Sequence, residues 1–237
     1  MKITFHGHAC VEIQSGSHQI LIDPFLTGNP KAITDPEQLN PDYILLTHGH
    51  GDHIGDAAAI AKRTGATIIT IVELAEYMES LGVRSTVGMN LGGGAEFPFG
   101  KIKWVPALHS SSITENGEIR YLGNPAGIVL ELDELTLYHA GDTALFSDMK
   151  LIGCRYKPEL AILPIGSFFT MDPEDALLAA EWVQAKHVIP VHYDTFPPIV
   201  QDAEHFAHEL GKQGITGHVM KPGDVLQTND WSIHKLK

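Results

Sequence analysis

Apolar positions along this chain fall mainly into short runs of strand length, separated by turns and by helix-like segments. Near the start, three such runs are joined by short turns that contain Gly, which is typical of an antiparallel meander. From residue 42 onward, strands and helices alternate, as in β-α-β units with parallel strands. Strands are expected at 3–5, 10–13, 19–22, 42–47, 66–71 and 84–87, and helices at 56–63 and 73–81.

The second half of the chain continues this alternation. Asp172 followed by Pro173 marks a helix start, because Asp caps free backbone N–H groups and Pro fits the first helical turn. Segments 25–41 and 110–117 are polar or rich in Pro and Gly, and we expect loops there, the second one mobile. Further strands are expected at 96–100, 101–108, 126–132, 135–139, 159–163, 188–191, 219–223 and 225–235, a hairpin turn at 133–134, and helices at 148–152, 172–184 and 201–212.

Metal-competent side chains follow directly after four of the expected strands. The densest group is the stretch Thr47-His48-Gly49-His50-Gly51-Asp52-His53, in which the glycines let the backbone turn tightly enough for several side chains to converge. Imidazole and carboxylate groups are common side-chain ligands of first-row metals. Later strands lead into His109, Asp142 and His192. Because sites in α/β folds gather at the carboxyl ends of strands, we expect these groups to share one site.

Five motifs along the chain resemble those of the metallo-β-lactamase superfamily. They are H-G-H-A at 6–9, I-D-P-F-L at 22–26, T-H-G-H-G-D-H-I-G-D at 47–56, Y-H-A-G-D-T at 138–143 and P-V-H-Y at 190–193. Within the superfamily, the chain is most similar to a compact branch of metal-dependent hydrolases, related to the ascorbate-6-phosphate lactonase type. The resemblance implies an α/β (α+β) fold of four αββα layers, built as one domain over 1–237.

The resemblance also implies a ligand set. By it, His48, His50 and His109 hold a first metal ion, Asp52, His53 and His192 hold a second, and Asp142 lies between the two. Asp23 matches an Asp that orients the ligands from beneath the loop at 47–56, called the metal loop below. Seven ligands exceed the four of one tetrahedral ion, so we predict two divalent ions per chain. Zinc is the first expectation, with manganese, iron, cobalt or nickel as alternatives.

A pair of such ions implies hydrolysis by a bridging hydroxide that attacks an ester, lactone or phosphodiester bond of a small substrate. The chain lacks the G-x-S-x-G motif of serine hydrolases, which agrees with a nucleophile derived from water. Asp52 is expected to contribute to catalysis as well as to metal binding. The acid that protonates the leaving group stays open among His8, Tyr193 and Asp194.

Three other functions remain as alternatives. An RNA-processing nuclease of the tRNA 3′-end type shares the ligand set, but a formal charge of −13, from 16 basic and 29 acidic residues, disfavours a nucleic-acid partner. A diiron oxidoreductase would carry Glu in place of His50 and usually a flavin domain. A non-catalytic metal-binding scaffold would not need an open ligand position.

The remaining features predict the cellular compartment of the protein and whether it enters a membrane. Two cysteines, Cys10 and Cys154, without C-x-x-C spacing indicate thiols in a reducing compartment. No apolar run is long enough to cross a bilayer, and the first residues already have a strand pattern. We therefore expect a soluble, cytoplasmic protein with no membrane partner; its oligomeric state is left open, a homo-oligomer included.

Overall fold

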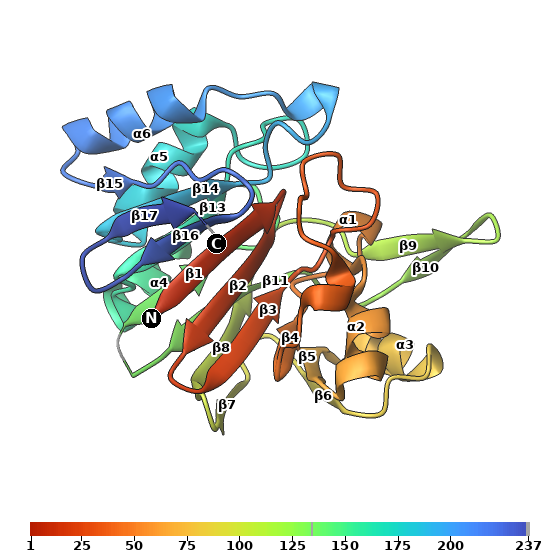
Figure 1. The fold of residues 1–237 in the computed structure, drawn as a ribbon. Coiled ribbons are helices and arrows are strands. Elements are labelled where there is room, and N and C mark those ends of the chain that lie inside the picture. The colour runs from red at the N-terminus through yellow and green to blue at the C-terminus, as the bar shows by residue number, and fades with distance from the viewer. Residues whose placement is uncertain (134, 236–237) are drawn as a thin grey trace.

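Two β-sheets pack face to face in the computed structural model, which describes residues 1–133 and 135–235 (Figure 1). Within these residues the first sheet has the order β17-β16-β1-β2-β3-β4-β5-β6. Its β3 to β6 half is parallel and the rest is antiparallel. The strands are β1 Lys2–Gly7, β2 Cys10–Ser15, β3 His18–Ile22, β4 Tyr43–Leu45, β5 Thr67–Ile71, β6 Thr86–Met89, β16 Asp224–Gln227 and β17 Ser232–Lys235.

The second sheet repeats this division, with the order β15-β14-β13-β12-β11-β8-β7. Strands β12 to β15 run parallel, and β7, β8, β11 and β12 run antiparallel to their neighbours. Its strands are β7 Gly94–Phe97, β8 Gly100–Pro106, β11 Ala126–Glu131, β12 Thr136–His139, β13 Leu160–Pro164, β14 His187–Val191 and β15 Thr216–Gly217. The ends of β3, β4, β12 and β14 therefore lie at one edge of the sandwich, where their loops meet.

Helices cover the outer face of each sheet (Figure 1). Helices α2 Ala57–Thr64 and α3 Val72–Ser80 pack on the first sheet, and α4 Met149–Tyr156, α5 Pro173–Trp182 and α6 Ala203–Lys212 pack on the second. The short helix α1 Gly51–Ile54 and the 3-10 turns at Pro36–Gln38 and Pro197–Ile199 lie in loops. Among the described helices, none has both the length and the apolar character needed to span a bilayer.

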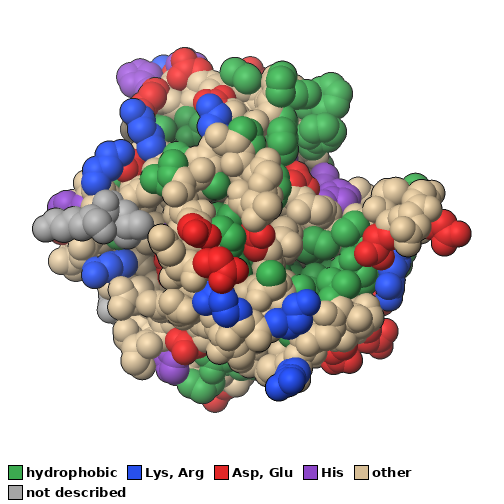
Figure 2. All heavy atoms as spheres, turned by 45° about the vertical axis from the view of Figure 1, so that its right-hand side comes forward, with side chains coloured by type: hydrophobic (Ala, Val, Ile, Leu, Met, Phe, Trp, Pro, Cys, Tyr) green, Lys and Arg blue, Asp and Glu red, His purple; other side chains and the backbone are tan. Residues whose placement is uncertain are grey.

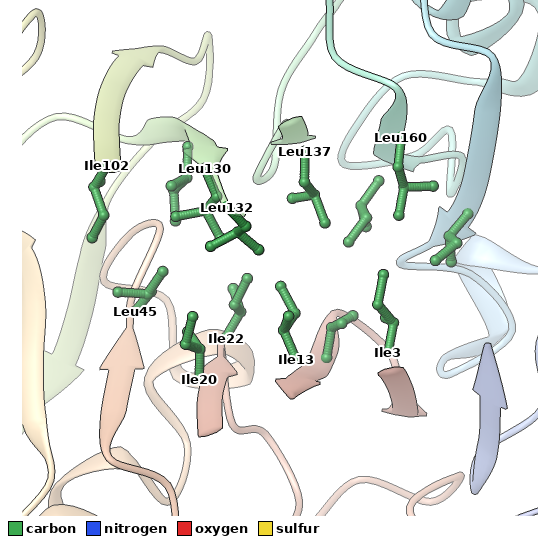
Figure 3. Packing of buried hydrophobic residues seen from close by; sticks show 14 of the residues in the cluster. Ile3, Ile13, Ile20, Ile22, Leu45, Ile102, Leu130, Leu132, Leu137 and Leu160 are labelled. Atoms are coloured by element: carbon green, nitrogen blue, oxygen red, sulfur yellow. The ribbon is translucent and has the colours of Figure 1, made fainter. Parts of the chain in front are cut away.

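The main core lies between the two sheets, and Figure 3 shows its two facing rows of aliphatic side chains. Ile13, Ile20 and Ile22 of the first sheet face residues such as Leu130 and Leu137 of the second. All five are fully buried. Burial stabilises a side chain of this size by roughly 1.5–3 kcal/mol, so this core holds the two sheets, and with them the loops at their edge, in a fixed relation.

The four-layer αββα prediction is confirmed, whereas several local predictions are wrong. Segment 110–117 is not simply a loop: strands β9 Ser112–Glu115 and β10 Glu118–Tyr121 form a projecting hairpin. Its turn, Asn116-Gly117, has φ of 52° and 82°, as the two-residue turns of hairpins require, so the signal was in the sequence. The predicted turn at 133–134 lies partly outside the described residues.

The last part of the chain also departs from the prediction. Residues 219–223 form no strand, because Pro222 lacks the N–H that a ladder needs and Gly223, with φ of 85°, makes a turn there. The turn is closed by the hydrogen bond from Asp224 N to Lys221 O at 2.8 Å. The single strand predicted at 225–235 is instead the hairpin β16–β17.

Candidate metal centre

The metal loop starts where β4 ends and folds back at once into the single turn of α1. Its tight path depends on two glycines. A side chain at Gly49 would meet Leu122 at 2.6 Å, and one at Gly55, whose φ is 32°, would meet the Pro24 carbonyl oxygen at 2.4 Å. Asp56 makes no cap hydrogen bond to the helix that follows it; its carboxylate accepts hydrogen bonds from Leu26 N and Thr27 N. The loop is thereby tied to the chain that follows β3.

The structure brings all seven predicted ligand residues together, and six of them fall into two separate groups; a further group, Asp23, His48 and His53, overlaps both. Within each group, the donor atoms lie within 4.8 Å of one another. His48, His50 and His109 form the first group. The second contains Asp52, His53 and His192, and it also contains His8, which the sequence analysis considered only as an acid.

Asp142 lies between the two groups. Its Oδ2 is 3.0 Å from His192 Nε2, 3.3 Å from His53 Nε2 and 3.6 Å from His109 Nε2. Strand β12 leads to this position through the sharp turn at Gly141, where φ is 63°. Buried His139 accepts a hydrogen bond from Gly141 N at its Nδ1, so it supports the turn from the core, as expected of a structural histidine.

Asp23 lies beneath the metal loop and is fully buried. Its carboxylate accepts hydrogen bonds from Thr47 N at 2.9 Å and from Thr47 Oγ1 at 2.6 Å, and it accepts a third from His53 Nδ1 at 2.8 Å. Because a carboxylate only accepts, the proton of a neutral His53 is fixed on Nδ1 and its Nε2 carries a lone pair. Asp23 therefore has the orienting position that the resemblance implied.

The same carboxylate acts on His48 through Thr47. Since the Thr47 hydroxyl donates to Asp23, it can only accept from His48 Nδ1, which is 3.0 Å away. His48 Nε2 then carries a lone pair as well. It faces His50 Nδ1 at 3.0 Å, and the other nitrogen of His50 is 3.2 Å from Ser110 Oγ. His48 thus presents an unprotonated Nε2, which can accept a hydrogen bond from His50 Nδ1 when no ion is bound.

These residues fit a bound cation. Among the described residues, His53 Nε2 and Asp142 Oδ1 are buried polar atoms without a hydrogen-bond partner, and both belong to the centre of the site. A lone pair on His53 facing a carboxylate oxygen is unfavourable unless a proton or a metal ion lies between them, and a metal ion can serve both groups at once. Nitrogen and carboxylate donors in these numbers are the set that divalent first-row metals take.

Burial controls the charges of the site. It lowers the pKa of His109 to about 4 and the pKa of His48 well below its usual range. Burial also opposes a charge on His53, but the carboxylates of Asp142 and Asp23 outweigh it and raise the pKa of His53 above its usual range. Most of the imidazoles are therefore neutral at pH 7, which is the form that binds metals.

The stability of the metal-free protein is expected to fall on acidification from pH 6.5 towards pH 4. Burial lowers the pKa of both His8 and His139 to about 4, so in this range the unfolded chain binds protons that the folded chain does not. Each such histidine costs about 1.4 kcal/mol of unfolding free energy per pH unit. Urea unfolding of chelator-treated protein at pH 7, 6 and 5 measures this. A His139→Gln variant should have a shallower slope, and a flat profile would contradict the assignment.

The three candidates for the leaving-group acid lie in different surroundings. Nε2 of His8 is 3.2 Å from Asp52 Oδ2, which places it in the second group. Tyr193 and Asp194 line a pocket with His8, flanked by Lys31 and Lys221. Asp194 closes a turn, since its carboxylate accepts from Gln201 N at 3.0 Å. Burial, and then Asp194, raise the pKa of Tyr193 to about 12.

Sequence reasoning missed several residues that hold the site. Thr47 and Thr195 relay hydrogen bonds to ligand-group histidines, and Ser111 Oγ accepts from Gly49 N at 3.0 Å. Ser110 contacts His50, and its place directly after His109 was a usable signal. Thr195 had no such signal, because hydroxyl residues are common in loops.

An apolar rim borders the site. Figure 2 shows histidine side chains at the surface with hydrophobic side chains gathered nearby. The loop after β13 passes the site, with Met171 N bonded to Thr143 O. On it, Phe168 is 70% exposed and Phe169 is 52% exposed, so these rings are not loop core. Leu108, next to His109, is 55% exposed.

Comparisons with known proteins show the family of the chain. Residues 18–193 match the family model described as a beta-lactamase superfamily domain. The chain is 54% identical over 215 residues to a UPF0173 metal-dependent hydrolase of Exiguobacterium sp., covering 91% of this chain and 96% of that protein. It is 51% identical over 228 residues to one of Geobacillus thermodenitrificans, covering 96% and 100%.

Solved structures extend the likeness to the fold. The structure of Igni18, a novel metallo hydrolase from Ignicoccus hospitalis, is 38% identical with a TM-score of 0.86, covering 95% of this chain and 97% of that one. An isothiocyanate hydrolase from Delia radicum gut bacteria shares the fold, with a TM-score of 0.77, 22% identity and coverage of 96% and 98%. Sequence motifs, site geometry and these matches agree, and the chain therefore belongs to the metallo-β-lactamase superfamily and, within it, to the UPF0173 family of metal-dependent hydrolases.

Proposed function

We propose that this protein uses two divalent metal ions to hydrolyse an ester, lactone or phosphodiester bond of a small substrate. The observation that carries the proposal is the convergence of five imidazoles and two carboxylates, from four segments of the chain, around Asp142. A structural metal site needs four ligands and no more. The larger set supports two ions and open positions for a substrate.

In this proposal the two groups have separate tasks. His48, His50 and His109 would hold one ion, Asp52, His53 and His192 the other, and Asp142 would contact both. When bound, the ions supply a Lewis acid for the oxygen of the scissile bond and a water molecule whose pKa is lowered towards 7. Zinc is the first candidate, and manganese, iron, cobalt and nickel suit the same donors.

The residues of the chain keep the donors ready. Asp23 fixes the protons of His53 and, through Thr47, of His48, so that both present lone pairs to the centre. Exposed Phe168 and Leu108 beside the site offer an apolar surface for a small organic substrate, and the charge of −13 disfavours a polyanion such as RNA.

Metal removal and restoration test the proposal. Protein stripped with a chelator is expected to be inactive on a panel of aryl esters, lactones and phosphodiesters, and added zinc or manganese is expected to restore turnover of at least one class. Cleavage of a structured RNA, with its salt dependence, serves as the comparison for a nuclease. Protein that holds two ions per chain and remains inert on every class would overturn the hydrolytic function.

A further inference from the structure

We propose that His8 is a further ligand of the metal centre, binding through Nε2 the same ion as Asp52, His53 and His192. The inference rests on the two-metal site proposed above and adds a residue to it. His8 is 1% exposed and shares a 4.8 Å group of donor atoms with those three residues. Its Nε2 is 3.2 Å from Asp52 Oδ2, and its ring centroid is 4.1 Å from that of His192.

The backbone at His8 is held in a costly conformation. Its φ is 58°, in the left-handed region that residues with side chains rarely occupy. His192, a proposed ligand, has a φ of 56° and donates its backbone N–H to His8 O at 2.8 Å. Such strain concentrates at functional sites, and here it joins His8 directly to a ligand.

Hydrogen bonding at the other side of the ring can hold the proton of neutral His8 on Nδ1. Nδ1 is 2.9 Å from Thr195 Oγ1, and that hydroxyl is 3.3 Å from Tyr193 O. A carbonyl oxygen only accepts, so when the hydroxyl donates to Tyr193, Nδ1–H donates to the hydroxyl. Nε2 is then left with a lone pair that faces the carboxylate of Asp52.

In this tautomer two acceptors lie 3.2 Å apart, and a cation beside them offsets their repulsion; in the other tautomer Nε2–H donates to Asp52. His8 in this respect matches the proposed ligands. His48 is anchored through Thr47 and presents Nε2 to the centre, and His53 is anchored by Asp23 in the same manner. The relay from His8 through Thr195 to a backbone carbonyl is the third case of one rule, in which one ring nitrogen is anchored and the other turns inward.

Cadmium substitution of the full chain tests the proposal directly. Protein labelled with ¹⁵N-histidine and loaded with ¹¹³Cd is expected to show metal–nitrogen coupling at six imidazoles: those of His48, His50, His53, His109 and His192, and that of His8. Coupling at the other five with a protonated Nε2 on His8 would overturn the proposal, and His8 would then only donate a hydrogen bond to Asp52. Loss of hydrolysis does not enter this readout, so the proposal can fail or hold independently of the substrate.

Variants separate a ligand from a hydrogen-bond donor. His8→Gln keeps an N–H donor but lacks the imidazole lone pair, so zinc affinity of the second site is expected to fall at least tenfold while the first site is unchanged. Thr195→Val, which removes the anchor, should weaken the same site by less. The matched control is His6→Gln: His6 is equally buried two residues earlier but contacts Thr34 and Glu12. Unchanged zinc affinity in His8→Gln would contradict the ligand role.

Discussion

Replacement of Asp142 by Ala is expected to lower kcat/KM of the zinc-loaded protein by about 10³-fold or more. The carboxylate Oδ2 is within 3.6 Å of nitrogens from both proposed ligand groups, so its loss removes the contact that the two ions would share. Electrostatic stabilisation by a metal pair amounts to several kcal/mol, and about 4 kcal/mol corresponds to a factor of 10³. Bound zinc should fall from two ions per chain towards one.

Metal analysis and steady-state kinetics on the same preparation check this expectation. The matched control is Asp148→Ala, a nearby aspartate that is exposed and forms no helix-cap hydrogen bond. Full zinc content with full activity in Asp142→Ala would contradict the shared position. Full zinc content without activity would instead assign the carboxylate to the reaction rather than to metal binding.

Asp23→Ala is expected to have the largest effect on stability. The carboxylate is fully buried and accepts three hydrogen bonds, so its removal leaves Thr47 N, Thr47 Oγ1 and His53 Nδ1 as buried donors without an acceptor. Breaking a buried charged network of this kind costs about 3–5 kcal/mol. Zinc affinity should fall by about 10–100-fold, because His53 and His48 lose the group that orients them.

Urea unfolding of the metal-free protein and calorimetric zinc titration measure the two effects. Asp23→Asn, which keeps one acceptor oxygen and the shape, should lose less stability than Asp23→Ala. Asp42→Ala is a second control, since Asp42 is exposed and accepts one hydrogen bond, from Gln19 N. A loss in Asp23→Ala no greater than in Asp42→Ala would mean that Asp23 does not support the loop.

The effects of these two carboxylates differ because their neighbours differ. Asp142 faces the open centre, where its partners are the inward nitrogens. Its contribution to metal binding and activity therefore requires bound cations. Asp23 is enclosed by Thr47 and His53, on the side of the His53 ring that faces away from the centre. Its contribution to stability is therefore present without metal. Removing metal should therefore leave the effect of Asp23→Ala on stability largely in place.

Much of the fold was predictable because its signals are local. Apolar runs of strand length and the Asp172-Pro173 helix start depend only on neighbouring residues, and the strands and the helix were found close to their true limits. The errors have specific causes. The Asn116-Gly117 hairpin was overlooked because its strands are largely polar, and the 219–223 strand was drawn across a Pro-Gly turn.

The sequence by itself determined the candidate ligands, because residue type and position after a strand are local features, and it determined the fold class through motifs that resemble those of the metallo-β-lactamase superfamily. Only the tertiary structure decided which nitrogen each histidine turns inward and that His8 joins the second group. Those choices depend on partners that the chain brings from far away, such as Thr195, which is 187 residues from His8. A hydrogen bond at that separation exists only after both sheets have packed, so no local pattern encodes it.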